Sequence, residues 1–114
     1  MKAITIKSDG TVEVTKISGK LKSLQDAVGG YIEALYLADD LVMLVNEDGL
    51  MRQLPINKAA SQVAVMAYAA NGRDAAIGSD RIVGDVLLVG DDGGEDFVSI
   101  PDDWEAKITA LSVW

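Results

Sequence analysis

The chain has 114 residues, 49% hydrophobic and 25% charged, which is the composition of an ordinary globular domain, and we expect residues 1–114 to form one. It contains no Cys and no His, which excludes thiol nucleophiles, disulfide bonds, Cys/His zinc sites and imidazole general bases. The net charge is −8, and residues 39–114 carry five basic against fourteen acidic side chains. Nucleic-acid affinity depends on Lys and Arg contacts to phosphates, so no direct DNA or RNA binding is expected.

The hydropathy pattern predicts a cytoplasmic protein without membrane contact. The amino-terminal residues MKAITIK contain no sustained apolar run, so no signal peptide is predicted. The apolar runs 41–45 and 86–89 are far shorter than the roughly 20 residues that span a bilayer.

A β-hairpin is predicted at the start of the chain, because Ile4 and Ile6 alternate with polar residues, as do Val12 and Val14. A two-residue loop at 9–10 would pair Ile6 with Glu13 and place the apolar sets of the two strands on opposite faces. A three-residue loop at 8–10 pairs Ile6 with Val12 and places Gly10 at a left-handed position. The three-residue loop is therefore the preferred prediction.

The next elements follow from spacing and turn signals. Leu21, Leu24 and Val28 share one face of a short helix, and Gly29 is its predicted left-handed cap. A strand over 31–37, a turn at 39–40 and a strand over 41–45 come next. The continuous apolar run 41–45 is typical of an interior strand covered on both faces. A hairpin turn at 46–49 is then expected to lead into a short strand over 50–54.

The second half begins with the longest predicted helix, over 58–70, with Asn57 as its N-cap. Its small face of Ala60, Ala64 and Ala67, with Tyr68 beside it, packs on the core or forms an oligomer seam, and the core is the preferred interpretation. A loop over 73–80 leads to a buried strand over 82–89, with a bend or bulge at Gly84.

The last segment is acidic. A loop over 91–96 and a short strand over 97–100 precede a helix that begins near Pro101 and packs through Trp104, Ile108 and Leu111. The final residue, Trp114, is either docked on the domain or free to contact a partner. Taken together, the elements predict an α+β fold, a mixed but largely antiparallel β-sheet with two or three helices packed against it.

The acidic loop supplies the candidate partner-binding residues, which are Asp91, Asp92, Glu95 and Asp96. Oxygen-rich loops can hold Ca²⁺ or Mg²⁺, but this spacing does not match an EF-hand. We interpret the loop as solvent-exposed, with no bound metal.

No catalytic residue and no cofactor site is predicted, so the protein is expected not to be an enzyme. The carboxylate pairs Asp39-Asp40 and Glu47-Asp48 lie in predicted turns, where Asp is favoured for turn chemistry alone. The Gly29-Gly30 pair precedes a strand rather than a helix, so it is not a phosphate-binding loop.

Five segments together resemble a known but uncharacterised domain family of bacteriophages, prophages and Gram-positive or actinobacterial genomes. They are MKAITIKSDGTVE, LKSLQDAVGGYIE, LVMLVNEDG, LPINKAA and IVGDVLLVG, and they cover most of residues 1–90. The family is defined by occurrence rather than by activity. The resemblance therefore implies a mobile-element setting and assigns no role to any residue.

These observations lead us to expect a non-enzymatic accessory protein that acts by binding a host protein or a component of a bacterial defence system. Two alternatives stay open. One is an acidic mimic of nucleic acid, which would occupy the basic cleft of a DNA-binding protein. The other is a homo-oligomer that sequesters a small nucleotide signal, although only three arginines are available to bind phosphate.

Overall fold

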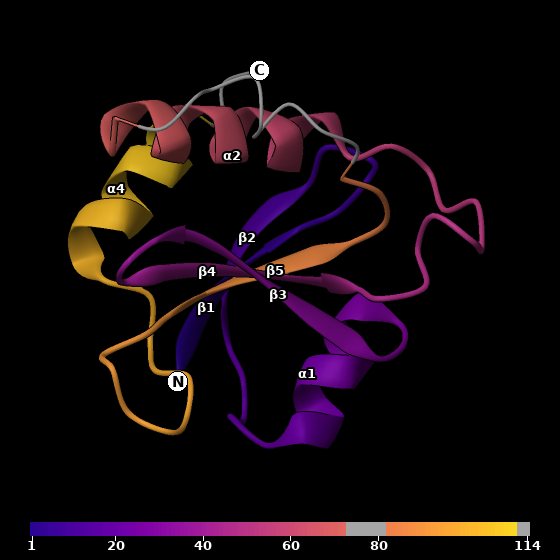
Figure 1. Cartoon of the computed structure of the whole chain (residues 1–114), viewed down its shortest axis with the longest axis horizontal. Helices are drawn as coiled ribbons and strands as arrows, with labels where there is room; N and C mark the ends of the chain where they lie inside the picture. Colours follow the sequence, from indigo (N-terminus) through magenta and orange to yellow (C-terminus); the bar gives the residue numbers. More distant parts are fainter. Residues whose placement is uncertain (73–81, 112–114) are drawn as a thin grey trace.

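The computed structural model describes residues 1–72 and 82–111 (Figure 1). The helices and strands in chain order are β1 (Lys2–Ile6), β2 (Val12–Lys16), α1 (Leu21–Val28), β3 (Ile32–Ala38), β4 (Leu41–Asn46), α2 (Lys58–Ala70), β5 (Val86–Gly90) and α4 (Asp102–Ala110). The predicted loop at 73–80 and the position of Trp114 lie outside the described residues.

The strands form one five-stranded sheet in the order β2-β1-β5-β4-β3. All the pairings between these strands are antiparallel, so the α+β prediction is confirmed and the sheet is more regular than the mixed one expected. Each outer pair of strands, β1–β2 and β3–β4, is a hairpin of consecutive strands. The last strand, β5, inserts between the two hairpins and joins them.

The first hairpin has the predicted register. Ile6 lies opposite Val12, and the amide of Lys7 donates to the carbonyl of Thr11 at 2.9 Å, which leaves a three-residue loop. Gly10 in that loop has a φ of +96°, a value that side chains other than Gly rarely adopt.

Helices cover both faces of the sheet: α2 and α4 pack on one face and α1 on the other (Figure 1). Side chains alternate along β4, so Met43 contacts the α2 side and Leu44 the α1 side. Leu44, Leu87 and Leu88 are fully buried, as the apolar runs predicted. The strand β4 is buried along its whole length because both of its faces are covered.

The helix α2 begins at the predicted N-cap. The side-chain oxygen of Asn57 accepts a hydrogen bond from the amide of Ala60 at 2.9 Å. Its side-chain nitrogen donates to the carbonyls of Ile6 and Gly84, at 2.9 and 2.8 Å, and the residue is fully buried. The small face of Ala60, Ala64 and Ala67 lies in the core, which confirms the preferred interpretation, and Tyr68 is half-buried against it.

The predicted strand over 50–54 is wrong, and so is the hairpin turn before it. After β4 the chain makes a series of turns over 47–53, closed by the amide of Leu54 donating to the carbonyl of Gly49 at 3.0 Å. A Cβ at Gly49 would lie 2.8 Å from the side chain of Val83, so tertiary packing fixes the chain here. Gln53 adopts a left-handed φ of 55° that no strand contains.

Three other predictions need smaller corrections. The strand expected from residue 82 begins only at Val86, because Gly84, with a φ of +75°, turns the chain before it. Of the strand expected over 97–100, only Val98 pairs, with Gly90. Leu21 is 58% exposed, because it lies at the first position of α1 rather than on its packed face. In α4, by contrast, Trp104 and Ile108 are buried as predicted.

Across residues 1–72 and 82–111, no helix combines the length and the apolar character needed to cross a membrane.

Candidate functional site

The acidic loop over 91–96 has a conformation that its own residues stabilise. The chain is closed at its base by two hydrogen bonds between Gly90 and Val98, at 2.8 and 3.0 Å. The carboxylates of Asp91 and Asp92 accept hydrogen bonds from the amides of Gly93 and Gly94, at 2.8 and 2.9 Å. These are Asx turns, so local turn chemistry accounts for the shape of the loop.

The candidate partner-binding residues are not all equally exposed. Asp92, Glu95 and Asp96 are exposed, as expected. Asp91 is half-buried, which corrects the prediction, and its amide donates to the carbonyl of Asp40 at 3.3 Å. In the part of the chain that the structure describes, no group of three acidic side chains is arranged to hold a metal ion.

The two carboxylate pairs noted in the sequence lie at opposite ends of the sheet. Leu41 pairs with Gly90, so the turn with Asp39 and Asp40 lies beside the acidic loop. Glu47 and Asp48 follow the other end of β4, which is about 17 Å away for a six-residue strand. The two pairs therefore do not converge on one site.

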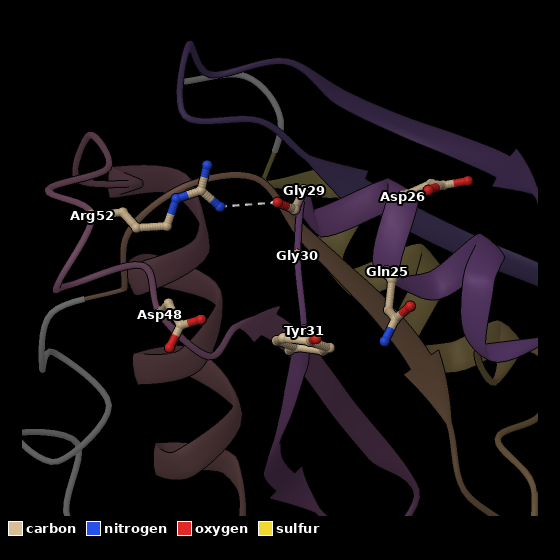
Figure 2. A pocket seen from close by; sticks show the side chains of 7 residues that line it. All are labelled: Gln25, Asp26, Gly29, Gly30, Tyr31, Asp48 and Arg52. Atoms are coloured by element: carbon tan, nitrogen blue, oxygen red, sulfur yellow. Dashed lines mark hydrogen bonds between the residues drawn. The ribbon is translucent and has the colours of Figure 1, made fainter.

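A pocket of about 540 Å³ lies at the end of the sheet where Asp48 is found (Figure 2). It is bounded by the carboxyl-terminal end of α1, by the start of β3 and by the turns after β4. Its lining residues are Gln25, Asp26, Gly29, Gly30, Tyr31, Asp48 and Arg52. The sequence interpretation missed this pocket, because three separate segments form it.

Asn46 fixes the geometry of the pocket from beneath. Its side-chain nitrogen donates to the carbonyl of Val28 at 3.2 Å, and its side-chain oxygen accepts from the amide of Asp48 at 2.9 Å. The residue is only 5% exposed. A Cβ on Gly30 would lie 2.9 Å from the same side-chain nitrogen, so Gly30 lets the chain pass close to Asn46. One buried amide thus holds α1 and the turn after β4 in a fixed relationship.

Arg52 closes the pocket at the end of α1. Its guanidinium donates to the carbonyl of Gly29 at 3.1 Å, as Figure 2 shows. Gly29 is the left-handed cap predicted from the sequence, with a φ of +77°, and its amide donates to the carbonyl of Gln25. The carboxyl-terminal end of a helix carries partial negative charge, which favours a cation in this position.

The turn beside the pocket exposes large apolar side chains. Met51 is 86% exposed and Leu50 61%, and Tyr31, which lines the pocket, is 66% exposed. The turn is nevertheless well defined, because the amides of Arg52 and Gln53 donate to the carbonyls of Asp48 and Leu50, at 2.9 and 3.1 Å. The turn therefore holds these exposed apolar side chains in a defined arrangement.

The lining of the pocket combines charged, amide and aromatic groups. It offers carboxylates, an amide, a phenol and a guanidinium, but no Ser or Thr hydroxyl and no nucleophile paired with a base. The sequence does contain a signal for the exposed turn, the apolar pair Leu50-Met51 between Gly49 and Arg52. The same pair is equally typical of a short strand, which is why it was misassigned.

Fold and pocket together define a small α+β domain with helices on both faces of an antiparallel sheet and an open pocket at one end. The chain belongs to the family named Domain of unknown function (DUF3846), which matches residues 1–111. The match extends the resemblance seen over residues 1–90 to nearly the whole chain. Comparison with curated proteins and with solved structures found no significant match.

Proposed function

We propose that the protein is a non-enzymatic binding protein that docks on a partner protein through the surface formed by Tyr31, Leu50, Met51 and Arg52, here called the turn face. The observation that carries this proposal is the exposure of Leu50 and Met51, 61% and 86%, on a turn held by backbone hydrogen bonds. The resemblance to a family of mobile elements supports a phage-type accessory protein. Its partner would then be a host or defence-system protein.

The energetics of the turn face support docking. Burial of apolar surface contributes about 25 cal/mol per Å², so removing Leu50 and Met51 from water favours association. Tyr, Met and Arg are enriched at protein interfaces. Because the turn is already ordered, a partner would order few additional backbone groups, and the entropic cost of binding is lower.

A nucleotide ligand is the less supported alternative for this pocket. Phosphate recognition needs several cationic donors, whereas the pocket has one arginine, Arg52, against the carboxylates of Asp26 and Asp48. Arg52 already donates to Gly29. The charge of the pocket therefore opposes an anionic small molecule.

The nucleic-acid mimic has one structural observation in its favour, the acidic end of the sheet. Asp39 and Asp40 lie beside the loop that carries Asp92, Glu95 and Asp96. An acidic surface of this kind would attract a basic cleft by long-range electrostatics. Binding of that kind would weaken steeply between about 50 and 300 mM salt, whereas docking through apolar side chains would change little.

Affinity capture from host lysate with quantitative mass spectrometry tests the proposal. The variant Leu50→Ser/Met51→Ser removes the apolar side chains, and Val14→Ser is the control. Val14 is 44% exposed and lies on β2, at the opposite edge of the sheet from β3.

We expect a partner that the wild type and the control retain, and that the double variant loses by about tenfold or more, since 1.4 kcal/mol corresponds to a tenfold change in affinity. Equal capture by all three proteins would contradict docking through the turn face. Capture of no specific protein by the wild type would contradict the proposal as a whole.

A further inference from the structure

We propose that the pocket beside Tyr31 receives the guanidinium of an arginine side chain presented by the partner protein. This inference rests on the proposed function and adds the chemistry by which the partner is recognised. Three features of the pocket carry it: an exposed aromatic ring, a positioned carboxylate and the carboxyl-terminal end of α1.

The ring of Tyr31 offers a surface for a planar cation. The residue is 66% exposed, and its carbonyl accepts a hydrogen bond from the amide of Glu47 at 2.8 Å, which fixes the backbone that carries the ring. A guanidinium stacks on an aromatic ring through both its charge and its plane. A lysine ammonium would gain only the interaction of its charge.

Asp48 supplies the carboxylate. Figure 2 shows Asp48 and Gln25 on either side of Tyr31, whereas Asp26 points away from the ring. Asp48 is half-buried, its amide is held by Asn46, and within the described residues it forms no ion pair. A carboxylate in this position can accept two parallel hydrogen bonds from a guanidinium. The side-chain oxygen of Gln25 adds a neutral acceptor.

The end of α1 already binds a guanidinium from within the chain. Arg52 donates to the carbonyl of Gly29 at 3.1 Å, so this end of the helix accepts the group that we assign to the partner. Arg52 is exposed, and its positive charge repels a second cation. It is therefore an internal competitor, and its removal should strengthen binding of an arginine ligand.

Two small probes test the assignment without a known partner. Purified protein is titrated with N-acetyl-arginine amide and, separately, with N-acetyl-citrulline amide, which has nearly the same shape but no charge. Amide chemical shifts are followed by two-dimensional NMR. We expect saturable shifts at Gly29, Gly30, Tyr31 and Asp48 with the arginine probe only.

Variants then assign the contacts. Asp48→Asn should weaken the arginine probe by about threefold or more, since one charge is lost from the pocket. Arg52→Gln should strengthen binding by a similar factor. Glu13→Gln, which removes an exposed carboxylate on β2 at the opposite edge of the sheet from β3, is the matched control and should leave the affinity unchanged. The spectra themselves show whether each variant is folded.

Equal responses to the two probes would overturn the inference, as would shifts centred on residues 91–96 or no saturable response at all. The outcomes separate this inference from the proposed function. Loss of lysate capture in the Leu50→Ser/Met51→Ser variant without arginine binding would leave docking intact and remove the arginine. If the pocket binds the arginine probe but the Leu50→Ser/Met51→Ser variant captures the partner as well as the wild type does, the arginine assignment stands and docking through the turn face is contradicted.

Discussion

Asn46 and Val28 are joined by a buried hydrogen bond from the side-chain amide of one to the carbonyl of the other, 3.2 Å long. This bond ties the end of β4 to the end of α1, two elements on which the pocket depends. The same side chain also accepts the amide of Asp48. Asn46 is therefore a positioning residue for the pocket.

Replacing Asn46 tests that role. Asn46→Ala leaves the carbonyl of Val28 and the amide of Asp48 without their partner, so the free energy of unfolding should fall by about 1 to 3 kcal/mol. Asn46→Asp should cost at least as much, because a carboxylate cannot donate to Val28. Urea denaturation measures both changes. A loss below about 0.5 kcal/mol, the range of ordinary surface substitutions, would contradict the role.

Asn57 should be among the most sensitive polar residues in the fold. Asn57→Ala removes the helix cap and leaves the buried carbonyls of Ile6 and Gly84 unpaired, so we expect a loss of about 2 to 4 kcal/mol. Asn71→Ala is the control, since Asn71 is exposed and its side chain donates to the carbonyl of Ala67, within its own helix. Thermal and urea unfolding of the two variants compare the effects, and similar losses would refute the special position of Asn57.

The hairpin loop depends on the backbone of Gly10. At a φ of +96°, Gly10→Val should lower the free energy of unfolding by about 1 to 2 kcal/mol, because a β-branched residue is strained there. Gly10→Asn should cost less, because Asn tolerates positive φ better. No heavy atom lies within 4 Å of a Cβ at this position, so a steric clash would not explain the difference. Equal free energies of unfolding for the Val and Asn variants would show that the loop can change its backbone conformation to accommodate either side chain.

Asp9 should make stability depend on acid pH. The backbone amide of Thr11, followed by its hydroxyl, stabilises the carboxylate and holds the pKa of Asp9 below its ordinary value of 3.8. The folded state therefore binds this proton less readily than the unfolded chain. The contribution of Asp9 is present above the ordinary pKa and is lost as the pH falls through the lower folded value.

NMR titration of the Asp9 side-chain carboxyl carbon measures this pKa directly. Thr11→Val, which removes the hydroxyl but keeps the amide, should move the pKa part of the way back toward 3.8. A pKa at or above the ordinary value in the wild type would contradict the prediction.

The acidic loop should be dispensable for folding. Changing its four predicted partner-binding residues to the corresponding amides keeps the oxygen acceptors of the two Asx turns and removes four negative charges, so stability should stay within about 0.5 kcal/mol or rise slightly. The substitutions are Asp91→Asn, Asp92→Asn, Glu95→Gln and Asp96→Asn. Urea unfolding tests this part.

The same variant bears on association. If the loop attracts a basic partner, the variant should bind that partner more slowly and lose salt dependence, while the dissociation rate changes little. Stopped-flow kinetics at several ionic strengths measure both rates. Unchanged kinetics would remove the loop from the binding mechanism.

The elements that local chemistry determines were predictable from the sequence. Three features each follow from the hydrogen bonding or the backbone angle of one residue type at one position. They are the N-cap at Asn57, the left-handed cap at Gly29 and the hairpin loop at Gly10. The buried strand β4 followed from an uninterrupted apolar run. In each case the signal lies within a few residues of its effect.

The pocket and the turn face were not predictable in this way. Leu50 and Met51 are apolar residue types that favour the prediction of a strand. The packing of Gly49 against Val83 instead directs the chain into turns. Asn46 is a residue type that is common in turns, yet its role depends on Val28, which lies in helix α1. These features arise from contacts between distant segments, and periodicity carries no information about such contacts.

The central position of β5 has a consequence for how the protein is made. Both hairpins consist of neighbouring segments and can pair early. Ile4 of β1 and Met43 of β4, however, both pair with Leu88 of β5, which is far along the chain from each of them. Closing such long loops is slow, because the entropy is lost before the contacts are gained. During synthesis, β1 and β4 therefore each keep an unpaired inner edge until the ribosome has released β5, and a nascent chain stopped before β5 is a template for aggregation.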